Sequence, residues 1–254
     1  MVLLPGGPGF AHDYLRPHLD SLAEDATLVW LDLPGTGRSE IPGGVESITH
    51  RRWIEDLEAL RVHLDFDRWI VFGHSYGGFV AVEYALEQPE SVAGLVLCAA
   101  APSPAHFATL FERVPPALSA ADRVLVARLL TGQVADDELE SCVREATRFF
   151  LRTDPTEALL HGFRLEPATF RHVLASCLPG VAIEDRLGEV VVPTLVVAGA
   201  DDWQSPLSVT GKLAAGITSA ELAVIPRAGH YPFIDAADQV VGVIRGWLRG
   251  ADDP

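Results

Sequence analysis

The sequence predicts an α/β protein with a mainly parallel sheet of about six strands and a helical insertion. Short apolar runs alternate with helical segments from the first residue onward, which is the rhythm of βαβ units. The runs are apolar without a break, as in strands that are buried on both faces. Between residues 101 and 190 this rhythm stops. A length of 254 residues suits one such domain with one insertion.

Each apolar run is expected to form a strand, and the helices between the runs are expected to cover the sheet. The expected strands are Val2 to Leu4, Thr27 to Leu31, Arg68 to Phe72, Val92 to Ala99, Thr194 to Ala198 and Glu221 to Ile225. The expected helices are Asp13 to Ala23, Thr49 to Leu64, Phe79 to Gln88, Pro206 to Ala215 and Ala236 to Arg249. The third helix should stop before Pro89, since proline disfavours helix in the preceding residue.

The region from 101 to 190 has apolar residues at helical spacing, such as Leu125 and Leu129, then Val143, Thr147 and Phe150. An insertion between two sheet strands is expected to lie over the carboxyl ends of the strands, where open α/β sheets bind ligands. We therefore expect residues 1–100 and 191–254 to form the core and residues 101–190 to form a helical cap.

Composition narrows the classes of partner. Hydrophobic residues make up 48% of the chain and charged residues 21%, which is typical of a globular protein. A net charge of -16 argues against nucleic acid or an anionic membrane as partner, because both would be repelled. A small molecule or a short peptide is the expected substrate.

The three cysteines, Cys98, Cys142 and Cys177, are far apart and have no CxxC spacing, so neither a disulfide framework nor a zinc site is indicated. A reducing compartment is expected. The N-terminus has no basic region, and its apolar run is too short for a signal peptide. These features predict a cytoplasmic protein.

Residues 73–77, Gly-His-Ser-Tyr-Gly, match the G-x-S-x-G nucleophile elbow between an expected strand and an expected helix. Glycines on both sides let the chain turn sharply and leave the hydroxyl of Ser75 exposed above the sheet. The helix start would also aim backbone N–H groups at an oxyanion beside the serine. The alternative is a Gly-rich turn in which the serine is incidental.

With this elbow and three further blocks, the chain resembles the α/β-hydrolase superfamily and, more narrowly, its prolyl aminopeptidase (proline iminopeptidase) branch. The further blocks are Gly6-Gly7-Pro8-Gly9 with His12-Asp13-Tyr14-Leu15, residues 32–39, and the late segments that contain Asp202 and His230. In the family a histidine usually precedes Gly6, whereas Pro5 stands here. The family's N-terminal antiparallel strand pair is missing, so Thr27 to Leu31 should lie near a sheet edge, where a homodimer could form.

The resemblance implies a catalytic triad in the chain order Ser, acid, His. The family's acid stands three residues after a strand-ending glycine and four before a proline, which selects Asp202 between Gly199 and Pro206. Asp201 is the alternative acid. His230 is the one histidine of nine in a Gly-His turn after the last expected strand.

The resemblance also assigns the other site residues. The oxyanion hole should use the backbone N–H groups of Gly7 and Tyr76, and the substrate should contact Phe10, Trp203 and Tyr231. Ser75 would attack, His230 would protonate the leaving group, and water would hydrolyse the acyl-enzyme. No metal or organic cofactor is expected.

Three functions remain open, and the first is the preferred interpretation. The first is cleavage of an N-terminal residue from a small peptide, which needs negative charge for the free amino group. The cap carboxylates that could supply this charge are Glu138, Glu140, Glu145, Glu157 and Glu166. The second is hydrolysis of a small apolar ester or lactone, which Trp203 favours because some relatives place a glutamate there. The third is a ligand-binding protein that keeps the fold without turnover.

Overall fold

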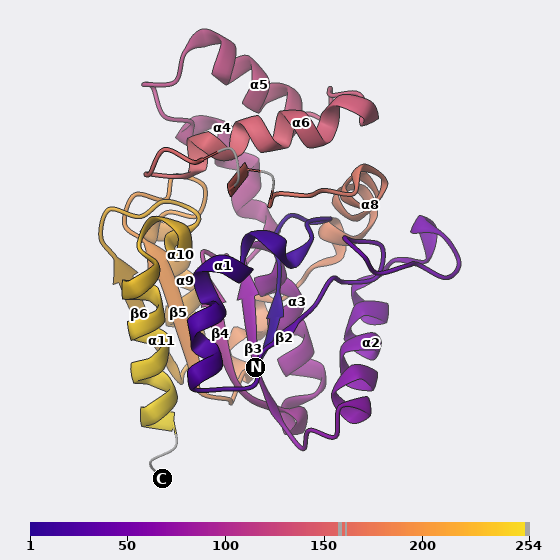
Figure 1. Ribbon diagram of the computed structural model, residues 1–254, viewed down its shortest axis with the longest axis vertical. Coiled ribbons are helices and arrows are strands. Elements are labelled where there is room, and N and C mark those ends of the chain that lie inside the picture. The colour runs from indigo at the N-terminus through magenta and orange to yellow at the C-terminus, as the bar shows by residue number, and fades with distance from the viewer. Residues whose placement is uncertain (157–158, 161, 252–254) are drawn as a thin grey trace.

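The computed structural model describes residues 1–156, 159–160 and 162–251. Six parallel strands form one sheet in the order β2-β1-β3-β4-β5-β6 (Figure 1). The strands are β1 (Val2–Leu4), β2 (Val29–Trp30), β3 (Trp69–His74), β4 (Val92–Cys98), β5 (Thr194–Gly199) and β6 (Ala220–Ile225). The predicted parallel sheet of about six strands is confirmed.

Strand β2 occupies one edge of the sheet, as the sequence predicts for this run. Only Val29 and Trp30 have strand geometry, and both pair with β1, where Val2 lies opposite Val29. Both residues are half-buried because no strand covers their outer side. A homodimer through this edge stays a prediction.

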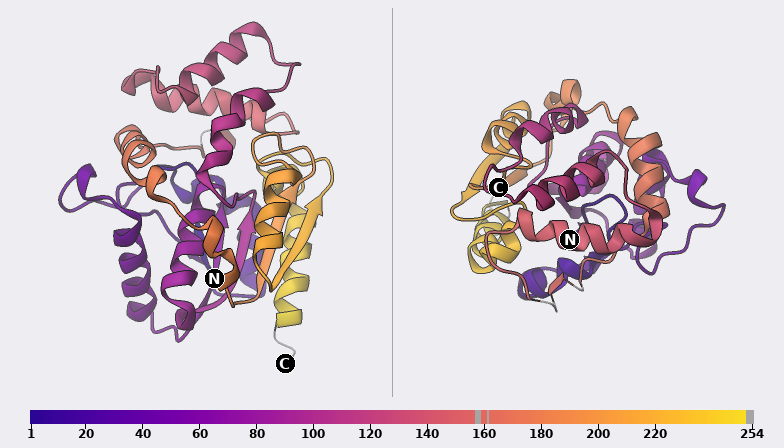
Figure 2. Two further views of the ribbon diagram at one scale, coloured as in Figure 1. Left: turned by 180° about the vertical axis from the view of Figure 1, so that it is seen from behind. Right: turned by 90° about the horizontal axis from the view of Figure 1, so that it is seen from above.

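Helices cover both faces of the sheet (Figures 1 and 2). One face carries α1 (Arg16–Leu19) and α11 (Ala237–Ala251). The other carries α2 (His50–His63), α3 (Tyr76–Glu87) and α9 (Leu207–Gly216). Strands that are buried on both faces cannot alternate apolar and polar residues, which explains the unbroken apolar runs.

Helix boundaries follow local chemistry. Thr49 caps α2, since its hydroxyl accepts a hydrogen bond from the Arg52 N–H at 3.1 Å. The predicted helix from Asp13 to Ala23 is instead three short pieces: the 3₁₀ turn η1 (His12–Tyr14), α1, and the 3₁₀ turn η2 (Asp20–Glu24). Leu19 has φ of -114° and ψ of 0°, which departs from α-helical geometry and marks the change from α1 to η2.

Helical segments fill the chain between β4 and β5. They are η5 (Pro104–Thr109), α4 (Leu110–Arg113), α5 (Ala120–Leu130), α6 (Asp136–Thr147), η6 (Arg148–Phe150), α8 (Pro167–His172), η7 (Val173–Cys177), η8 (Leu178–Gly180) and η9 (Glu184–Glu189). Helices α4, α5 and α6 lie across the end of the sheet at which the strands finish (Figures 1 and 2). The division into a core of 1–100 and 191–254 and a cap of 101–190 stays a prediction.

Three short elements complete the fold: η3 (Val45–Ser47), η4 (Pro89–Ser91) and α10 (Pro232–Asp235). None of the helices in the described part of the chain combines the length and the apolar character that a membrane span requires.

Candidate active site

Ser75 lies in the sharp turn between β3 and α3. Its φ of 50° and ψ of -114° fall in a region that residues other than glycine rarely adopt. The Ser75 N–H donates to the carbonyl of Cys98 at 2.8 Å, and the Ser75 carbonyl accepts from the Gly78 N–H at 2.9 Å. A Cβ on Gly77 would lie 2.6 Å from the carbonyl oxygen of Leu4, so the turn needs glycine at that position.

Three side chains from distant parts of the sequence meet at this turn. The Oγ of Ser75 lies 2.9 Å from Nε2 of His230, and Nδ1 of His230 lies 2.8 Å from Oδ2 of Asp202. The other carboxylate oxygen of Asp202 accepts from the N–H groups of Gln204 and Ser205. A carboxylate can only accept, so Nδ1 donates to Asp202 and Nε2 is free to accept the serine proton.

The two neighbouring aspartates differ sharply in environment. The side chain of Asp202 is 1% exposed, whereas that of Asp201 is 44% exposed and forms an ion pair with Arg152 at 3.4 Å. Asp202 is therefore the member of the pair that lies against His230, and Asp201 lies at the surface.

The backbone around His230 is held by the segment after α6. The His230 N–H donates to the carbonyl of Phe150 at 2.8 Å. A Cβ on Gly229 would lie 2.3 Å from that same carbonyl oxygen, so only glycine lets the two segments approach. Asp235 strengthens this contact, because its carboxylate accepts from the N–H groups of Gly229 and Arg152. The sequence gives no signal for these contacts, which depend on tertiary packing.

The predicted oxyanion-hole residues flank Ser75. Tyr76 begins α3, so its N–H belongs to the first helical turn, in which N–H groups have no partner within the helix. On the other side, a Cβ on Gly6 would lie 3.1 Å from Cβ of Ser75, which shows that the loop after β1 passes beside the serine. Gly7 follows in that loop with φ of +123°, a value that favours glycine.

The ring of Tyr76 is buried beside α2. Its hydroxyl lies 2.5 Å from Nε2 of His50, and Nδ1 of His50 contacts the carboxylate of Glu83. Burial raises the pKa of Tyr76, so the phenol stays neutral. These contacts hold the first turn of α3 against α2.

The predicted substrate-contacting residues occupy two places. Phe10 and Tyr231 are buried and pack against Phe163, with ring centroids 5.9 Å and 5.1 Å away. Trp203 is half-buried, stacks on Phe150 at 4.7 Å and donates its indole N–H to the Phe149 carbonyl at 2.8 Å. Contact of these three residues with substrate stays a prediction.

His106 and Phe150 also lie near the triad, although sequence reasoning did not single them out as site residues. The ring centroid of Phe150 is 6.1 Å from that of His230. Burial lowers the pKa of His106 to about 4, and the charge of Asp202 opposes this shift weakly. Phe150 also stacks on Trp203, so two aromatic rings lie in series beside His230.

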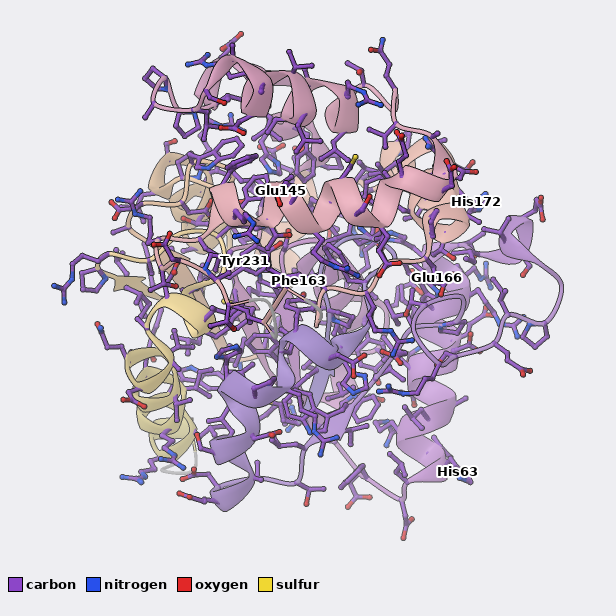
Figure 3. All side chains as sticks on the ribbon, turned by 45° about the horizontal axis from the view of Figure 1, so that its top comes forward. His63, Glu145, Phe163, Glu166, His172 and Tyr231 are labelled. Carbon is purple, nitrogen blue, oxygen red and sulfur yellow. The ribbon has the colours of Figure 1, made fainter. Side chains whose placement is uncertain are left out.

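The predicted cap carboxylates that the structure describes are exposed or half-buried. Three of them are paired with arginines on the cap: Glu138 with Arg128, Glu140 with Arg144 and Glu145 with Arg148. Glu166 is exposed and lies on a different segment from Glu145 (Figure 3). Glu157 lies outside the described residues.

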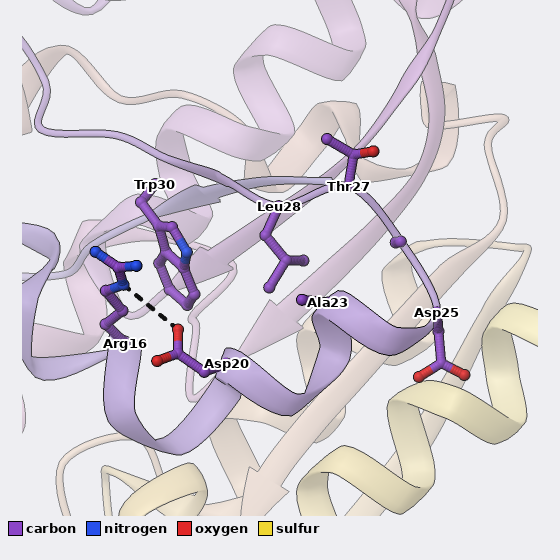
Figure 4. A pocket seen from close by; sticks show the side chains of 8 residues that line it. Arg16, Asp20, Ala23, Asp25, Thr27, Leu28 and Trp30 are labelled. Carbon is purple, nitrogen blue, oxygen red and sulfur yellow. Dashed lines mark ion pairs between the residues drawn. The ribbon is translucent and has the colours of Figure 1, made fainter.

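Two open cavities lie away from the triad. A shallow groove of about 700 Å³ follows the edge strand β2, between Trp30 and the ion pair of Arg16 with Asp20 (Figure 4). A second hollow of about 310 Å³ is lined by His50 and Glu83 among others. Within the described ranges, no group of three or more His, Cys, Asp or Glu side chains is arranged to hold a metal ion.

Comparison with known proteins places most of the chain in one family. A family model described as "Alpha/beta hydrolase family" matches residues 1–243. A proline iminopeptidase of Lactobacillus helveticus is 28% identical over 269 residues, which cover 100% of this chain and 90% of that protein.

Solved structures share the fold. The proline iminopeptidase of Mycobacterium smegmatis superimposes with a TM-score of 0.79 at 22% identity, covering 99% of this chain and 89% of that one. A thermophilic esterase from Thermogutta terrifontis has a TM-score of 0.78 at 25% identity, covering 98% and 89% of the two chains. Peptidases and esterases therefore both occur among the similar proteins.

Proposed function

The chain belongs to the alpha/beta hydrolase family, and from this premise we propose that it is a serine hydrolase that works through an acyl-enzyme. The observation that carries this proposal is the hydrogen-bonded series of Ser75, His230 and Asp202, with contacts of 2.9 Å and 2.8 Å. A serine hydroxyl is a weak nucleophile near neutral pH and needs an adjacent base whose tautomer is fixed. His230 and Asp202 supply these two requirements.

The reaction proceeds in two halves. His230 takes the proton of Ser75 as the hydroxyl attacks the substrate carbonyl, and the N–H groups of Gly7 and Tyr76 bind the negative oxygen of the tetrahedral intermediate. His230 then protonates the leaving group, which leaves the acyl group on Ser75. In the second half, His230 activates a water molecule that releases the acid.

The geometry best fits a small carboxylic ester with an apolar acyl group. Trp203 and Phe150 form a stacked pair beside His230 and offer apolar surface. The carboxylates of Glu138, Glu140 and Glu145 are each paired with an arginine, so they carry little free charge for a substrate amine.

Cleavage of an N-terminal residue from a small peptide is the second candidate. The proline iminopeptidases among the relatives favour it, since they match the whole length of this chain. The Gly6-Gly7-Pro8-Gly9 block agrees with this resemblance. The reaction would use the same three side chains, and only the group that holds the substrate would differ.

Paired substrates separate the two candidates. The purified chain should hydrolyse 4-nitrophenyl acetate and butyrate, and its kcat/KM for proline-4-nitroanilide should be at least about a hundredfold lower, since Glu138, Glu140 and Glu145 are already paired with arginines. Faster turnover of the anilide would reject the ester assignment and support the peptidase. A Ser75→Ala variant is the control, and background turnover by the wild-type chain on both substrates would favour a binding protein without catalysis.

The thiols and the net charge support a proposal for the compartment and for the classes of partner. Cys98, Cys142 and Cys177 are free, which fits a reducing compartment such as the cytoplasm. The net charge of -16 disfavours nucleic acid and anionic lipid as partners.

A further inference from the structure

A buried series of three hydrogen bonds runs behind Ser75. The Gly6 N–H donates to the hydroxyl of Tyr14 at 2.6 Å. The Tyr14 hydroxyl lies 2.8 Å from Nδ1 of His74, and Nε2 of His74 lies 2.9 Å from the backbone carbonyl of His230. Tyr14 and His74 are each 1% exposed. None of these bonds involves an atom that the proposed reaction uses.

The direction of every bond in the series is fixed by its two ends. A backbone N–H can only donate and a backbone carbonyl can only accept. Nε2 of His74 must therefore donate to His230, and in the neutral ring Nδ1 accepts from Tyr14. Burial lowers the pKa of His74 well below its usual value and raises the pKa of Tyr14 well above its own, so both side chains stay neutral. The series is a set of fixed bonds and does not carry a proton.

The series connects the three parts of the proposed catalytic machinery. Gly6 precedes the oxyanion-hole residue Gly7, His74 precedes the nucleophile, and the bonded carbonyl belongs to the catalytic histidine. The backbone of His230 is therefore held on both sides, by the Phe150 carbonyl at its N–H and by His74 at its carbonyl. Serine, base and oxyanion hole are thus connected by two side chains whose hydrogen bonds involve none of the reacting atoms, and the ring of His74 also packs against that of His230 at 5.2 Å.

The hydroxyl of Tyr14 is separable from the packing of its ring. The ring stacks on Phe163 at 4.9 Å and meets Phe10 edge-on at 5.7 Å. Phenylalanine would keep both contacts, so the loss of the hydroxyl alone tests the hydrogen bonds.

We infer that Tyr14 and His74 are positioning residues, which align the oxyanion-hole loop and His230 with Ser75 through these three hydrogen bonds. This role depends on the serine hydrolase function proposed above. A displacement of catalytic groups by about 1 Å can lower a rate about a hundredfold, so small shifts in this network should be visible in kcat.

The first test compares Tyr14→Phe with Tyr84→Phe on a 4-nitrophenyl ester. Tyr84 is the matched control, because it is also fully buried and its hydroxyl also makes two hydrogen bonds at the far end of α3, donating to Glu58 and accepting from the indole N–H of Trp69. Tyr14→Phe should lower kcat about 10- to 100-fold and leave KM within about twofold. Tyr84→Phe should lower the Tm and leave kcat within about twofold.

The second test uses His74→Leu and His74→Gln, which differ in hydrogen bonding. Leucine removes both bonds, whereas the glutamine amide can still donate to the His230 carbonyl. We expect the kcat of His74→Gln to be at least about tenfold higher than that of His74→Leu. Adding Tyr14→Phe to His74→Leu should lower kcat by a smaller factor than Tyr14→Phe does in the wild-type chain, because only the bond from Gly6 is left to lose. Losses that multiply, or equal kcat values for the glutamine and leucine variants, would overturn the inference.

The rate at which a fluorophosphonate labels Ser75 separates this inference from the proposed function. If the wild-type chain is labelled and Tyr14→Phe is labelled more slowly, the result supports both the positioning role and the proposed function. Equal labelling rates and equal kcat in folded Tyr14→Phe would overturn the positioning role and leave the serine hydrolase intact. Absence of labelling in the wild-type chain would overturn the function and the positioning role together. If Tyr14→Phe does not fold, the His74 pair decides the matter.

Discussion

At the scale of single residues, burial distinguishes Asp202 from Asp201. Asp202→Asn should lower kcat about 10³- to 10⁴-fold, because an amide at this position no longer fixes the tautomer of His230. Asp201→Asn is the matched control and should leave kcat within about twofold, since Asp201 is 44% exposed and pairs with the surface residue Arg152. Steady-state kinetics on a 4-nitrophenyl ester measure both. Equal losses in the two variants would contradict the assignment.

Asp32 is a buried carboxylate that ties the loop after β2 to the loop after β1. Its oxygens accept from the backbone N–H and ring Nδ1 of His12 and from the backbone N–H of Arg38. Burial alone would raise the pKa of Asp32, but these hydrogen bonds outweigh it and lower the pKa from 3.8 to about 2. The charged form is therefore more stable in the folded chain than in the unfolded chain.

Asp32→Asn should lower the free energy of unfolding by about 2 kcal/mol near pH 7. Because the folded pKa is depressed, this contribution is complete above the unfolded pKa of about 4 and is lost as the pH falls through about 2. Urea unfolding across that pH range should show that the difference in the free energy of unfolding between Asp32→Asn and the wild type becomes smaller as the pH falls. Asp56→Asn, which breaks an exposed pair with Arg52, should change stability by less than about 0.5 kcal/mol. A gap for Asp32→Asn that does not change with pH would contradict this explanation.

The family resemblance, together with the position of each residue in a short turn after a strand, selected Ser75, Asp202 and His230, which lie in one hydrogen-bonded series in the structure. The side chains that hold them could not be selected in this way. Tyr14 is 60 positions from His74, and His74 is 156 positions from His230. Such pairs arise from tertiary packing. The sequence around a tyrosine in a short helical segment does not indicate which distant group its hydroxyl will bind.

At the scale of elements, the close approach of α3 to β1 depends on Gly77. A Cβ there would lie 2.6 Å from the carbonyl oxygens of both Leu4 and Pro5, which are backbone atoms that cannot move aside cheaply. Gly77→Ala should therefore lower the free energy of unfolding by about 3 kcal/mol. Chemical denaturation followed by circular dichroism measures this change.

Gly211 provides the matched control within α9. Apart from its chain neighbours and the backbone of its own helix, no atom lies within 4 Å of a Cβ built on Gly211, which is inside α9. Gly211→Ala should raise the free energy of unfolding by about 0.5 to 1 kcal/mol, since alanine favours helix. Similar effects of the two substitutions would show that helix propensity, and not the contact with β1, sets the requirement at Gly77.

Sheet strands were predicted better than the elements around them. Apolar runs located all six strands, and the signal is strongest in β3, β4 and β5, which are buried on both faces. The segment from Asp13 to Ala23 is predicted as one helix but forms a short α-helix between two 3₁₀ turns, and Leu19 leaves helical geometry with φ of -114° and ψ of 0°. The contacts between the segment that joins β4 to β5 and the loop that carries His230, such as the hydrogen bond from the His230 N–H to the Phe150 carbonyl, depend on how short helices stack and have no periodic pattern in the sequence.

At the scale of the whole molecule, the net negative charge should lower the Tm at low salt. The chain has 35 acidic and 19 Lys and Arg residues, so its surface repels itself at low salt. Raising NaCl from about 0.01 M to about 0.15 M shortens the screening length from about 30 Å to about 8 Å. The Tm should rise by a few degrees over this range and level off above it, as measured by differential scanning calorimetry. A Tm that falls over the same range would contradict net repulsion, and KCl in place of NaCl controls for specific ion effects.

The central claim is that the fold brings Ser75, His230 and Asp202 together to activate one hydroxyl. Peptide mapping by mass spectrometry after exposure to a fluorophosphonate tests this claim most directly. We predict one adduct per chain, on the peptide that contains Ser75, and no adduct in Ser75→Ala. An unlabelled wild-type chain, or an adduct on a different residue, would contradict it.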